Sequence, residues 1–454
     1  MVGNKIFKPF KEMNLGKILY LIKKNIGTVE KKDFTIKVKV DNKKVNLKSL
    51  FLLYILLNRY EDYYFITIEN LPFCLMPDAK EHIVYRKEKK GNYYYDEICH
   101  NCYLMNTCPG WNEIPNIDRR KISSPKNIPK EIVMEITTKC NLNCRVCTID
   151  KTKSSDVDFA TVKEIMKECK FLGIKAVRFT GGEPLLHREV GKMLLYARKN
   201  GFYVLLNTNA TAVTSSALKL LEKTVDNLLI SLQGFNQNSD KRLTNSPTEF
   251  SRKITNIIRL NSRIPLVRIG TVISKTLINN LSKYYNLLKK IGINNWELYR
   301  PIIKNDKDEE FRISRKDLLK VMSFLLSLKK KRMKVKIANP LPFCISKNIN
   351  LSLATLLGAI ADDGHSRIVW DTEGYFKPSY FIKKNLGRTI EKAWHHPFLE
   401  KLRGLNYLPA RCKQCRYLKW CKGGSRALAK IIYNSYFHPD PLLISIKKKS
   451  HLHS

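Results

Sequence analysis

From residue 131 onward, short apolar runs alternate with segments of helical periodicity. The runs that predict strands are 132–136, 176–179, 202–206, 227–231, 266–273 and 296–300. The segments that predict helices lie near 159–172, 188–200, 214–223, 248–261, 278–291 and 315–330. Six consecutive strand–helix units predict an α/β fold with a parallel sheet, most simply a partial (β/α)6 barrel of the TIM type. In such barrels the chemistry lies at the carboxyl ends of the strands.

Cysteine-rich regions flank this predicted barrel on both sides. We divide the chain into five parts. These are an N-terminal region (1–118), a linker (119–130), the core barrel (131–335), a separate auxiliary region (340–445) and a basic tail (446–454). In the first region, the alternating segment 34–41 predicts a strand that turns at Asp41-Asn42 and returns over 45–47. Residues 50–58 suit a short buried helix with Ser49 as its N-cap.

Composition restricts the setting of the chain. No apolar leader follows Met1, and the longest apolar run, 50–57, is far shorter than the roughly 20 residues of a membrane span. We therefore expect a cytoplasmic, reducing location without a transmembrane segment, where clustered cysteines bind metal more often than they form disulfides. The net charge of +42 indicates either anionic partners, nucleic acid among them, or a lysine-rich solvated surface, which is the more ordinary explanation.

Three cysteines follow the first predicted barrel strand with the spacing Cys140-x3-Cys144-x2-Cys147. Three thiolates on one tight loop can hold three irons of a cubane cluster and leave the fourth iron open to a ligand. The alternative is a zinc knuckle that lacks one ligand. The position of the loop on the expected catalytic face favours the cluster.

The second predicted strand ends in Gly181-Gly182-Glu183-Pro184. Two glycines let the backbone approach a ligand closely, and Glu183 supplies a carboxylate for an ammonium group. Alone, this sequence is compatible with a simple turn. One strand–helix unit after the cysteine loop, it is a strong functional signal.

These motifs together resemble the radical S-adenosylmethionine (radical SAM) superfamily over roughly residues 131–300. The resemblance implies that Cys140, Cys144 and Cys147 bind a [4Fe-4S] cluster whose open iron takes the amino and carboxylate groups of SAM. It further implies reductive cleavage of SAM to a 5′-deoxyadenosyl radical, with electrons from a donor of the ferredoxin or flavodoxin type. By motif position, the residues expected to contact SAM are Gly181, Gly182, Glu183, Asn207, Asn209, Ser231 and Arg242. The sequence departs from many relatives at Val146, at Gln233 and in the spacing of Arg242.

The remaining cysteines form a repeat. Leu71-Pro-Phe-Cys74 recurs as Leu341-Pro-Phe-Cys344, and the loop Cys99-x2-Cys102-x5-Cys108-x-Gly110 recurs as Cys412-x2-Cys415-x5-Cys421-x-Gly423. Each set offers four thiolates, which is full coordination for a [4Fe-4S] cluster or for zinc. Only Cys169 is left over, and its helical spacing from Ile165 predicts a core residue.

The C-terminal set resembles the SPASM-type auxiliary domain of radical SAM enzymes. Ser379 and Ser425 stand where the two-cluster form of that domain has cysteines. We therefore expect one auxiliary [4Fe-4S] cluster there, with Cys344 as fourth ligand and His438 as the rival. For the N-terminal set, the shared spacing favours a second cluster over zinc, and zinc stays an alternative.

The resemblance implies an enzyme, a radical SAM oxidoreductase or maturase that modifies a peptide, protein or peptide-derived cofactor. One alternative is modification of an anionic substrate such as RNA, a tetrapyrrole or a lipid, which the eleven excess positive charges of residues 401–454 favour. A second alternative is a non-catalytic metal-binding protein that docks nucleic acid. If strand parity is right, Glu297, Tyr299 and Arg300 face the substrate.

Overall fold

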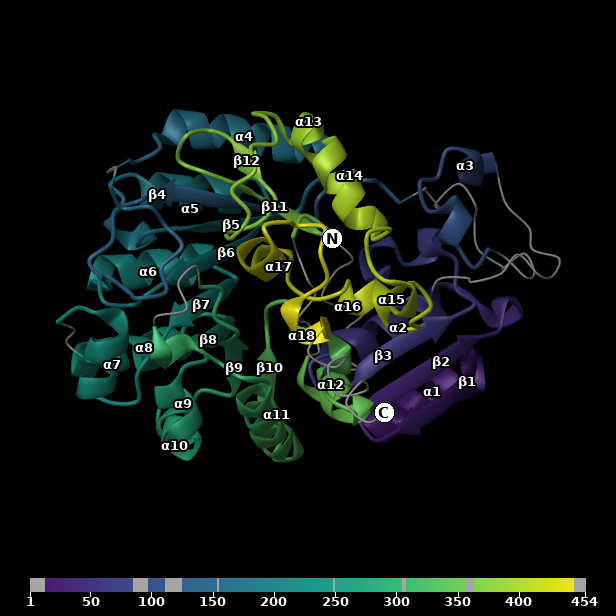
Figure 1. Cartoon of the computed structure of the whole chain (residues 1–454). Helices are drawn as coiled ribbons and strands as arrows, with labels where there is room; N and C mark the ends of the chain where they lie inside the picture. Colours follow the sequence, from purple (N-terminus) through teal and green to yellow (C-terminus); the bar gives the residue numbers. More distant parts are fainter. Residues whose placement is uncertain are drawn as a thin grey trace. The chain divides into compact units, whose positions relative to one another are not determined.

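The computed structural model describes residues 13–84, 97–110, 125–152, 155–247, 250–303, 308–356 and 363–444. The chain forms two compact units, Met1–Asn127 and Ile128–Ser454 (Figure 1). The boundary falls inside the predicted linker 119–130. Residues 119–124 and the predicted basic tail 446–454 lie outside the described residues. Among the described helices, none is both long and apolar enough to cross a membrane.

The first unit is a small α/β structure with a three-stranded sheet in the order β1-β2-β3. Strands β1 and β2 form an antiparallel hairpin, and β3 pairs with β2 in parallel. The predicted strand near 34–41 is β2, whose alternate residues are buried. The elements are α1 (Leu15–Asn25), β1 (Gly27–Lys32), β2 (Thr35–Val40), α2 (Leu47–Tyr60), β3 (Phe65–Glu69) and α3 (Glu97–His100).

Two details of this unit differ from the sequence predictions. The hairpin partner of β2 precedes it in the chain, and the predicted return strand over 45–47 is wrong, because a short 3₁₀ turn, Asn42–Lys44, leads directly into α2. Helix α2 begins earlier than predicted, with Asn46 as the N-cap. Ser49 lies three residues inside and completes a reciprocal capping box with Asn46.

The second unit is built on a nine-stranded sheet in the order β10-β9-β8-β7-β6-β5-β4-β11-β12 (Figure 1). All neighbouring strands pair in parallel except β12, which is antiparallel to β11. The strands are β4 (Glu131–Thr137), β5 (Ala176–Gly181), β6 (Tyr203–Thr208), β7 (Asn227–Ser231), β8 (Leu266–Val272), β9 (Asn295–Tyr299), β10 (Lys334–Ile337), β11 (Arg367–Trp370) and β12 (Phe376–Lys377). The predicted α/β partial barrel is therefore confirmed.

Helices connect these strands in the predicted order, and α4 and α11 have the predicted bounds. The segment predicted as one helix near 278–291 is divided into α9 and α10. The helices of the barrel are α4 (Phe159–Leu172), α5 (Val190–Lys199), α6 (Ser215–Thr224), α7 (Gln237–Thr244), α8 (Phe250–Asn261), α9 (Lys275–Asn279), α10 (Leu281–Lys290) and α11 (Arg315–Lys330). Cys169 of α4 is fully buried, as its spacing predicted.

The sheet is wider than six strands. Strand β10 extends it beyond β9, and β11 pairs in parallel with β4 on the other side. Residues 340–454, predicted as a separate region, thus contribute to the barrel sheet, because buried Ile368 and Val369 continue its apolar ladder. The later helices are α12 (Ile349–Thr355), α13 (Ile390–Trp394), α14 (Pro397–Gly404), α15 (Ala410–Lys413), α16 (Leu418–Cys421), α17 (Arg426–Tyr433) and α18 (Pro441–Ile444).

Candidate active site

Cys140, Cys144 and Cys147 lie on one loop that follows the carboxyl end of β4. Removal from water raises the pKa of the Cys144 thiol to about 11, and the neighbouring Cys147 and Cys140 add to this rise, while Lys253 and Lys151 oppose it. The three sulfurs are therefore close enough to influence one another. Two ammonium groups near them favour the thiolate form that binds metal.

The loop is held by contacts within itself and with the rest of the barrel. The amide of Asn143 donates to the Ser246 hydroxyl at 2.7 Å, and the Lys151 ammonium donates to the Leu142 carbonyl. Arg145 forms an ion pair of 2.6 Å with Asp308. These contacts fix the position of the cysteines at the barrel rim.

The two glycines after β5 bring that strand end directly against the start of the cysteine loop. The amides of Gly182 and Glu183 donate to the carbonyls of Thr137 and Lys139, each at 2.7 Å. A Cβ on Gly181 or Gly182 would lie only 2.2 or 2.0 Å from these carbonyl oxygens, and Gly181 has a φ of 126°. Only glycine fits both positions, so the spacing of the two motifs in the sequence reflects a physical contact.

Glu183 is fully buried beneath this turn. One carboxylate oxygen accepts from the Thr208 hydroxyl at 2.7 Å and from the Leu185 amide at 3.1 Å, and the other accepts from the Asn209 amide at 2.7 Å. Burial raises the pKa of Glu183, and these hydrogen bonds counteract it. The carboxylate therefore joins the ends of β5 and β6, which the sequence did not predict.

Asn209 connects that junction to the cysteine loop. Its side-chain amide donates to the side-chain oxygen Oδ1 of Asn141 at 2.9 Å and approaches the Cys140 sulfur at 3.9 Å. Arg242, on α7, donates to the Thr276 hydroxyl and lies 3.5 Å from the Glu310 carboxylate. Of the predicted SAM contacts, Gly181, Gly182, Glu183 and Asn209 thus lie together at the loop, and Arg242 is engaged by Glu310.

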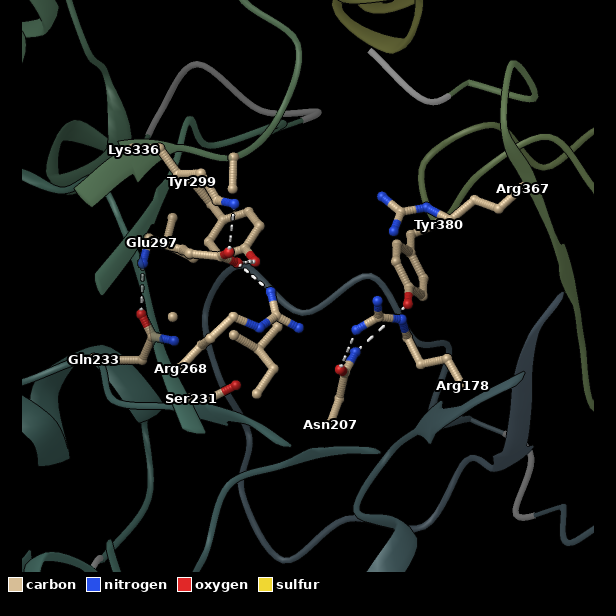
Figure 2. A pocket seen from close by; sticks show the side chains of 14 residues that line it. Arg178, Asn207, Ser231, Gln233, Arg268, Glu297, Tyr299, Lys336, Arg367 and Tyr380 are labelled. Carbon is tan, nitrogen blue, oxygen red and sulfur yellow. Dashed lines mark hydrogen bonds and ion pairs between the residues drawn. The ribbon is translucent and has the colours of Figure 1, made fainter. Parts of the chain in front are cut away.

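The other two predicted SAM contacts, Asn207 and Ser231, line a cavity of about 280 Å³ inside the barrel (Figure 2). Glu297 and Tyr299 line it too, as strand parity predicted, whereas Arg300 points away and forms a buried ion pair of 2.9 Å with Asp440. Strands β5 to β11 and the segment after β12 contribute the lining side chains, which are Arg178, Asn207, Leu229, Ser231, Gln233, Arg268, Gly270, Val272, Glu297, Tyr299, Lys336, Ala338, Arg367 and Tyr380.

Charged side chains in this interior fall into two groups, which Figure 2 shows on opposite sides of the view. In the first group, Glu297 accepts from Arg268 at 2.7 Å and lies 3.2 Å from Lys336. Burial alone would raise the pKa of Glu297, but Lys336 and Arg268 lower it to about 2, so this carboxylate is ionised at neutral pH.

The second group is centred on Glu131 of β4. Arg178 holds both of its oxygens, at 2.6 and 3.2 Å, and Arg367 lies 3.8 Å away. Against the effect of burial, these guanidinium groups lower the pKa of Glu131. The sequence analysis did not identify these residues as functional. The only available signal was charged residues within otherwise apolar strands, as in Ala176-Val-Arg178-Phe.

A fully buried ion pair lies behind the cysteine loop. Lys253 of α8 is 3.4 Å from Asp240 of α7, and both side chains have no exposed surface. Lys253 also acts electrostatically on Cys144 and Glu183. Lys253 was not predicted from the sequence, although it shares the buried face of α8 with Ile257 and Leu260.

The C-terminal cysteines influence one another electrostatically. Removal from water raises the pKa of Cys421 to about 12, with further contributions from Cys344 and Cys412. Cys344 in turn is influenced by Cys412 and Cys415. His438 instead stacks on Tyr433 at 3.9 Å between ring centroids. Cys344 is therefore in electrostatic contact with the three-cysteine loop, and the choice between Cys344 and His438 as fourth ligand stays a prediction.

The N-terminal cysteines repeat this arrangement within the first unit. Removal from water raises the pKa of Cys74 to about 12, and Cys108, Cys99 and Cys102 all add to it. The distant cysteine lies in a 3₁₀ turn in both sets, Phe73–Leu75 and Phe343–Ile345. The amide of Cys102 donates to the Cys99 carbonyl, and Cys415 does the same to Cys412, both at 3.0 Å. The sequence repeat therefore encodes a common loop geometry.

The residues at all three sites fit iron–sulfur clusters by their chemistry. Within the described ranges, no three His, Cys, Asp or Glu side chains converge on the point that a single metal ion would occupy. A cubane binds each thiolate through a different iron, so its ligands need not share one point. Which metal each set binds stays a prediction, as do the individual SAM contacts.

Comparison with known proteins agrees with the geometry. The Radical SAM superfamily model matches residues 134–312. The AdoMet-dependent heme synthase of Methanosarcina barkeri is 25% identical over 342 residues, which cover 70% of this chain and 97% of that protein.

Two solved structures share the fold. Streptococcus suis SuiB bound to the precursor peptide SuiA matches with a TM-score of 0.57 and 17% identity, over 70% of this chain and 76% of that one. The structure of anSMEcpe with bound AdoMet and the Cp18Cys peptide matches with a TM-score of 0.55 and 18% identity, over 70% of this chain and 94% of that one. The cysteine loop and the Gly-Gly-Glu turn both lie within residues 134–312, the part of the chain that matches the Radical SAM superfamily.

Proposed function

We propose that this enzyme removes a hydrogen atom from a peptide, protein or peptide-derived cofactor and so modifies it oxidatively. The observation that carries the proposal is the pair of backbone hydrogen bonds from Gly182 to Thr137 and from Glu183 to Lys139. It joins the turn that would hold the amine of SAM to the loop that would hold the cluster.

Each part of the site has a distinct role in this proposal. Cys140, Cys144 and Cys147 hold a [4Fe-4S] cluster with one open iron. Gly181 and Gly182 present backbone to the methionyl amine of SAM, and Glu183 holds the ends of β5 and β6 in place for it. When bound, the cluster and SAM together supply a 5′-deoxyadenosyl radical, which takes the hydrogen atom from the substrate. The electron for this reaction comes from a low-potential donor of the ferredoxin or flavodoxin type.

Both four-cysteine sets would hold auxiliary [4Fe-4S] clusters, the C-terminal one in a SPASM-type domain. Their protein ligands are complete, which leaves no open iron for substrate. Electron transfer or structural support is therefore the expected role. Zinc in the N-terminal set is the alternative that metal analysis distinguishes.

Two observations support a peptide substrate. Both similar structures described above contain a bound peptide. A second cavity of about 640 Å³ borders Thr148, Ile149 and Asp150, which directly follow Cys147. Glu135 and Lys377 lie on another side of this cavity and form an ion pair of 2.6 Å. A cavity of this size beside the loop provides room for an extended chain to reach the radical.

A second candidate is a smaller anionic substrate, a tetrapyrrole being one example. It is favoured by the cationic interior around Arg178, Arg268 and Lys336 and by the sequence similarity to the heme synthase. For RNA or lipid as substrate, and for nucleic acid as partner, the support is the basic composition alone.

The proposal is tested by anaerobic reconstitution with iron and sulfide, followed by SAM and a strong reductant. The wild-type chain should be brown and should release 5′-deoxyadenosine, and Cys144→Ala should abolish that release. A colourless protein, or unchanged release by Cys144→Ala, would contradict the proposal.

The substrate class is tested with deuterated peptides. Transfer of deuterium from a peptide into 5′-deoxyadenosine would identify the hydrogen donor. If deuterium moves only from a carboxylated small molecule, the second candidate is correct.

A further inference from the structure

We propose that the cavity of about 640 Å³ beside the cysteine loop binds a cationic group of the substrate, an ammonium or a guanidinium, at the carboxylate of Glu135. This inference rests on the proposed function, because it names the chemistry of the substrate at the same site. It goes beyond that function by assigning the recognition to one carboxylate and to the Lys377 ammonium that orients it.

The sheet register places Glu135 and Lys377 on the inner face of the barrel. Val133 of β4 is the register partner of Arg178 on one side and of Val369 on the other, and Val369 is in turn the partner of Lys377 on β12. Register partners point to the same face of a sheet, and Glu135 shares that face because it follows Val133 by two residues. Since Arg178 lines the barrel cavity, this face is the interior one.

The carboxylate of Glu135 has one paired oxygen and one oxygen without a hydrogen bond. The residue has only 4% of its surface exposed, and its Oε2 pairs with the Lys377 ammonium at 2.6 Å. Its Oε1 is out of contact with solvent and accepts no hydrogen bond from any residue that the structure describes. A buried oxygen of this kind costs free energy until a donor reaches it. The adjoining cavity, which Glu135 lines, is the route by which a donor can arrive.

Lys377 orients the carboxylate for such a ligand. This lysine is itself buried on β12, and its ammonium holds Oε2 of Glu135. Because the terminal torsion of a glutamate is broad, a small rotation about it turns Oε1 toward the cavity while Oε2 stays with Lys377. The ion pair therefore uses one oxygen and leaves the other for the substrate.

Two further glutamates of the barrel interior show what a carboxylate in this position binds. Glu131 and Glu297 each pair with two cations, as described above. Within the part of the chain that the structure describes, Glu135 pairs with one cation, Lys377. A second cation supplied by the substrate would give Glu135 the environment that the other two carboxylates already have.

The pKa of Glu135 supports this comparison. Burial raises it, Lys377 lowers it, Asp371 raises it further and Lys383 opposes that rise, and the net result is a raised pKa. At the two other glutamates burial acts in the same direction, but the paired cations bring the pKa below its ordinary value. A single paired cation is thus insufficient to offset burial at Glu135, and a second one would stabilise its ionised form.

The cavity joins Glu135 to the predicted radical site. Residues 148–150, which directly follow Cys147, form part of its lining. Thr137, two residues after Glu135, lines it too, and the Thr137 carbonyl accepts the hydrogen bond from the Gly182 amide. A substrate whose cation lies at Glu135 is therefore held against the loop that is expected to bind the cluster. The volume is sufficient for a lysine or arginine side chain with its flanking backbone.

The test is calorimetric titration of the reconstituted full chain, at low salt and without reductant. The probe is acetyl-Ala-Lys-Ala-amide, and the matched neutral probe is the same peptide with norleucine in place of lysine. The lysine peptide should bind roughly tenfold more tightly or better, the usual effect of a charge-assisted hydrogen bond. Equal binding of the two peptides would overturn the inference.

Variants locate the preference for lysine at the carboxylate. Glu135→Gln keeps the shape and removes the charge, and it should abolish the preference. Because this change leaves Lys377 without its partner, a double variant with Lys377→Gln removes the whole ion pair and should abolish the preference too. Glu222→Gln is the matched control, since Glu222 pairs with Arg263 on the surface and the preference should stay unchanged. A preference that survives in both Glu135 variants would overturn the inference.

A further variant tests the cavity without changing any charge. Thr372, in the turn between β11 and β12, lines the cavity, and Thr372→Trp places a large side chain there. This variant should bind the lysine peptide at least tenfold more weakly while the thermal midpoint stays near that of the wild type. Undiminished binding would place the lysine site outside this cavity.

The source of the cation is distinguished with n-butylammonium. Tighter binding of the lysine peptide than of n-butylammonium indicates a peptide side chain, and the reverse indicates a small amine. SAM has an ammonium group of its own, so the titration is repeated with saturating SAM. Binding of the lysine peptide should persist, and its displacement by SAM would overturn the assignment of this carboxylate to the substrate.

Release of 5′-deoxyadenosine is measured on the same preparations after reductant is added. If release is normal and the lysine peptide binds no better than the norleucine peptide, the inference fails and the proposed function stands. If the preference for lysine is present and release is absent, the proposed function fails.

Discussion

The backbone amide of Phe343 donates a hydrogen bond of 3.4 Å to the sulfur of Cys421, 78 residues further along the chain. Gly423 donates a second one to the same sulfur. In the other unit, Cys108 accepts from the amides of Phe73 and Gly110. The two four-cysteine sets therefore share their N–H···S contacts as well as their spacing. Such contacts stabilise the thiolate form of both sulfurs, which is the form that binds metal.

Replacing Cys108 or Cys421 should remove the cluster that the four-cysteine set of that residue is predicted to bind. We expect Cys108→Ala and Cys421→Ala each to lower the iron content of the anaerobically reconstituted chain by about four atoms. Iron and zinc are measured per chain by mass spectrometry. Cys169→Ala is the control, since this buried thiol lies in the core of α4 and should leave iron unchanged. Unchanged iron together with loss of one zinc in Cys108→Ala would identify the N-terminal set as a zinc site.

The contact between the glycine turn and the cysteine loop should be sensitive to a single methyl group. Gly182→Ala places a Cβ at 2.0 Å from the Lys139 carbonyl oxygen, so the loop must shift. We expect roughly tenfold or greater loss of 5′-deoxyadenosine release with the iron content retained. In the control Gly191→Ala on α5, the new Cβ meets its nearest atom, Leu220 Cδ2 of α6, at an ordinary contact distance of 3.5 Å, and release should be normal. Normal release by Gly182→Ala would show that the contact does not position SAM.

Removing the buried ammonium group of Lys253, which acts on the cysteine loop, should lower the free energy of unfolding. Lys253→Met removes the ammonium that pairs with buried Asp240, while the hydrogen bond from the Gly234 amide to Asp240 remains, and the expected destabilisation is about 3–5 kcal/mol. Urea unfolding followed by tryptophan fluorescence measures it. Lys192→Met is the control, because Lys192 pairs with Glu189 at the surface, where such pairs contribute about 0–1 kcal/mol. Equal midpoints for the two variants would contradict the assignment.

The Glu297 group predicts a pH dependence of stability. The folded pKa of about 2 lies below the ordinary value of 4.5, so Glu297 contributes stability above pH 4.5 that is lost as pH falls toward 2. The full contribution is about 3 kcal/mol. The difference in stability between wild type and Glu297→Gln should therefore be largest near pH 7 and shrink below pH 4.5. Acid loss of clusters affects both proteins and cancels in this difference. A difference independent of pH would show that Glu297 is not ionised in the folded chain.

Much of the fold was predictable because its signals are local. The helix over 159–172 has a cap at Asp158 and left-handed Gly173 at its end, and its predicted bounds match α4. The pairing of β11 with β4 was not predicted, since the two strands are separated by more than 200 residues and pair only in the folded chain. Likewise, β1 was not predicted as the hairpin partner of β2. The turn between these strands contains Asp33, whose positive φ of 47° leaves no trace in the hydrophobic pattern.

The sequence by itself determined the radical SAM motifs and the paired cysteine sets, because ligand type and spacing are fixed along one short segment of chain. Only the tertiary structure decided that Glu183 joins β5 to β6 and that Arg178 and Arg367 share Glu131. These relationships bring together side chains from distant strands, and their charges act on one another only after the curved sheet has removed them from water.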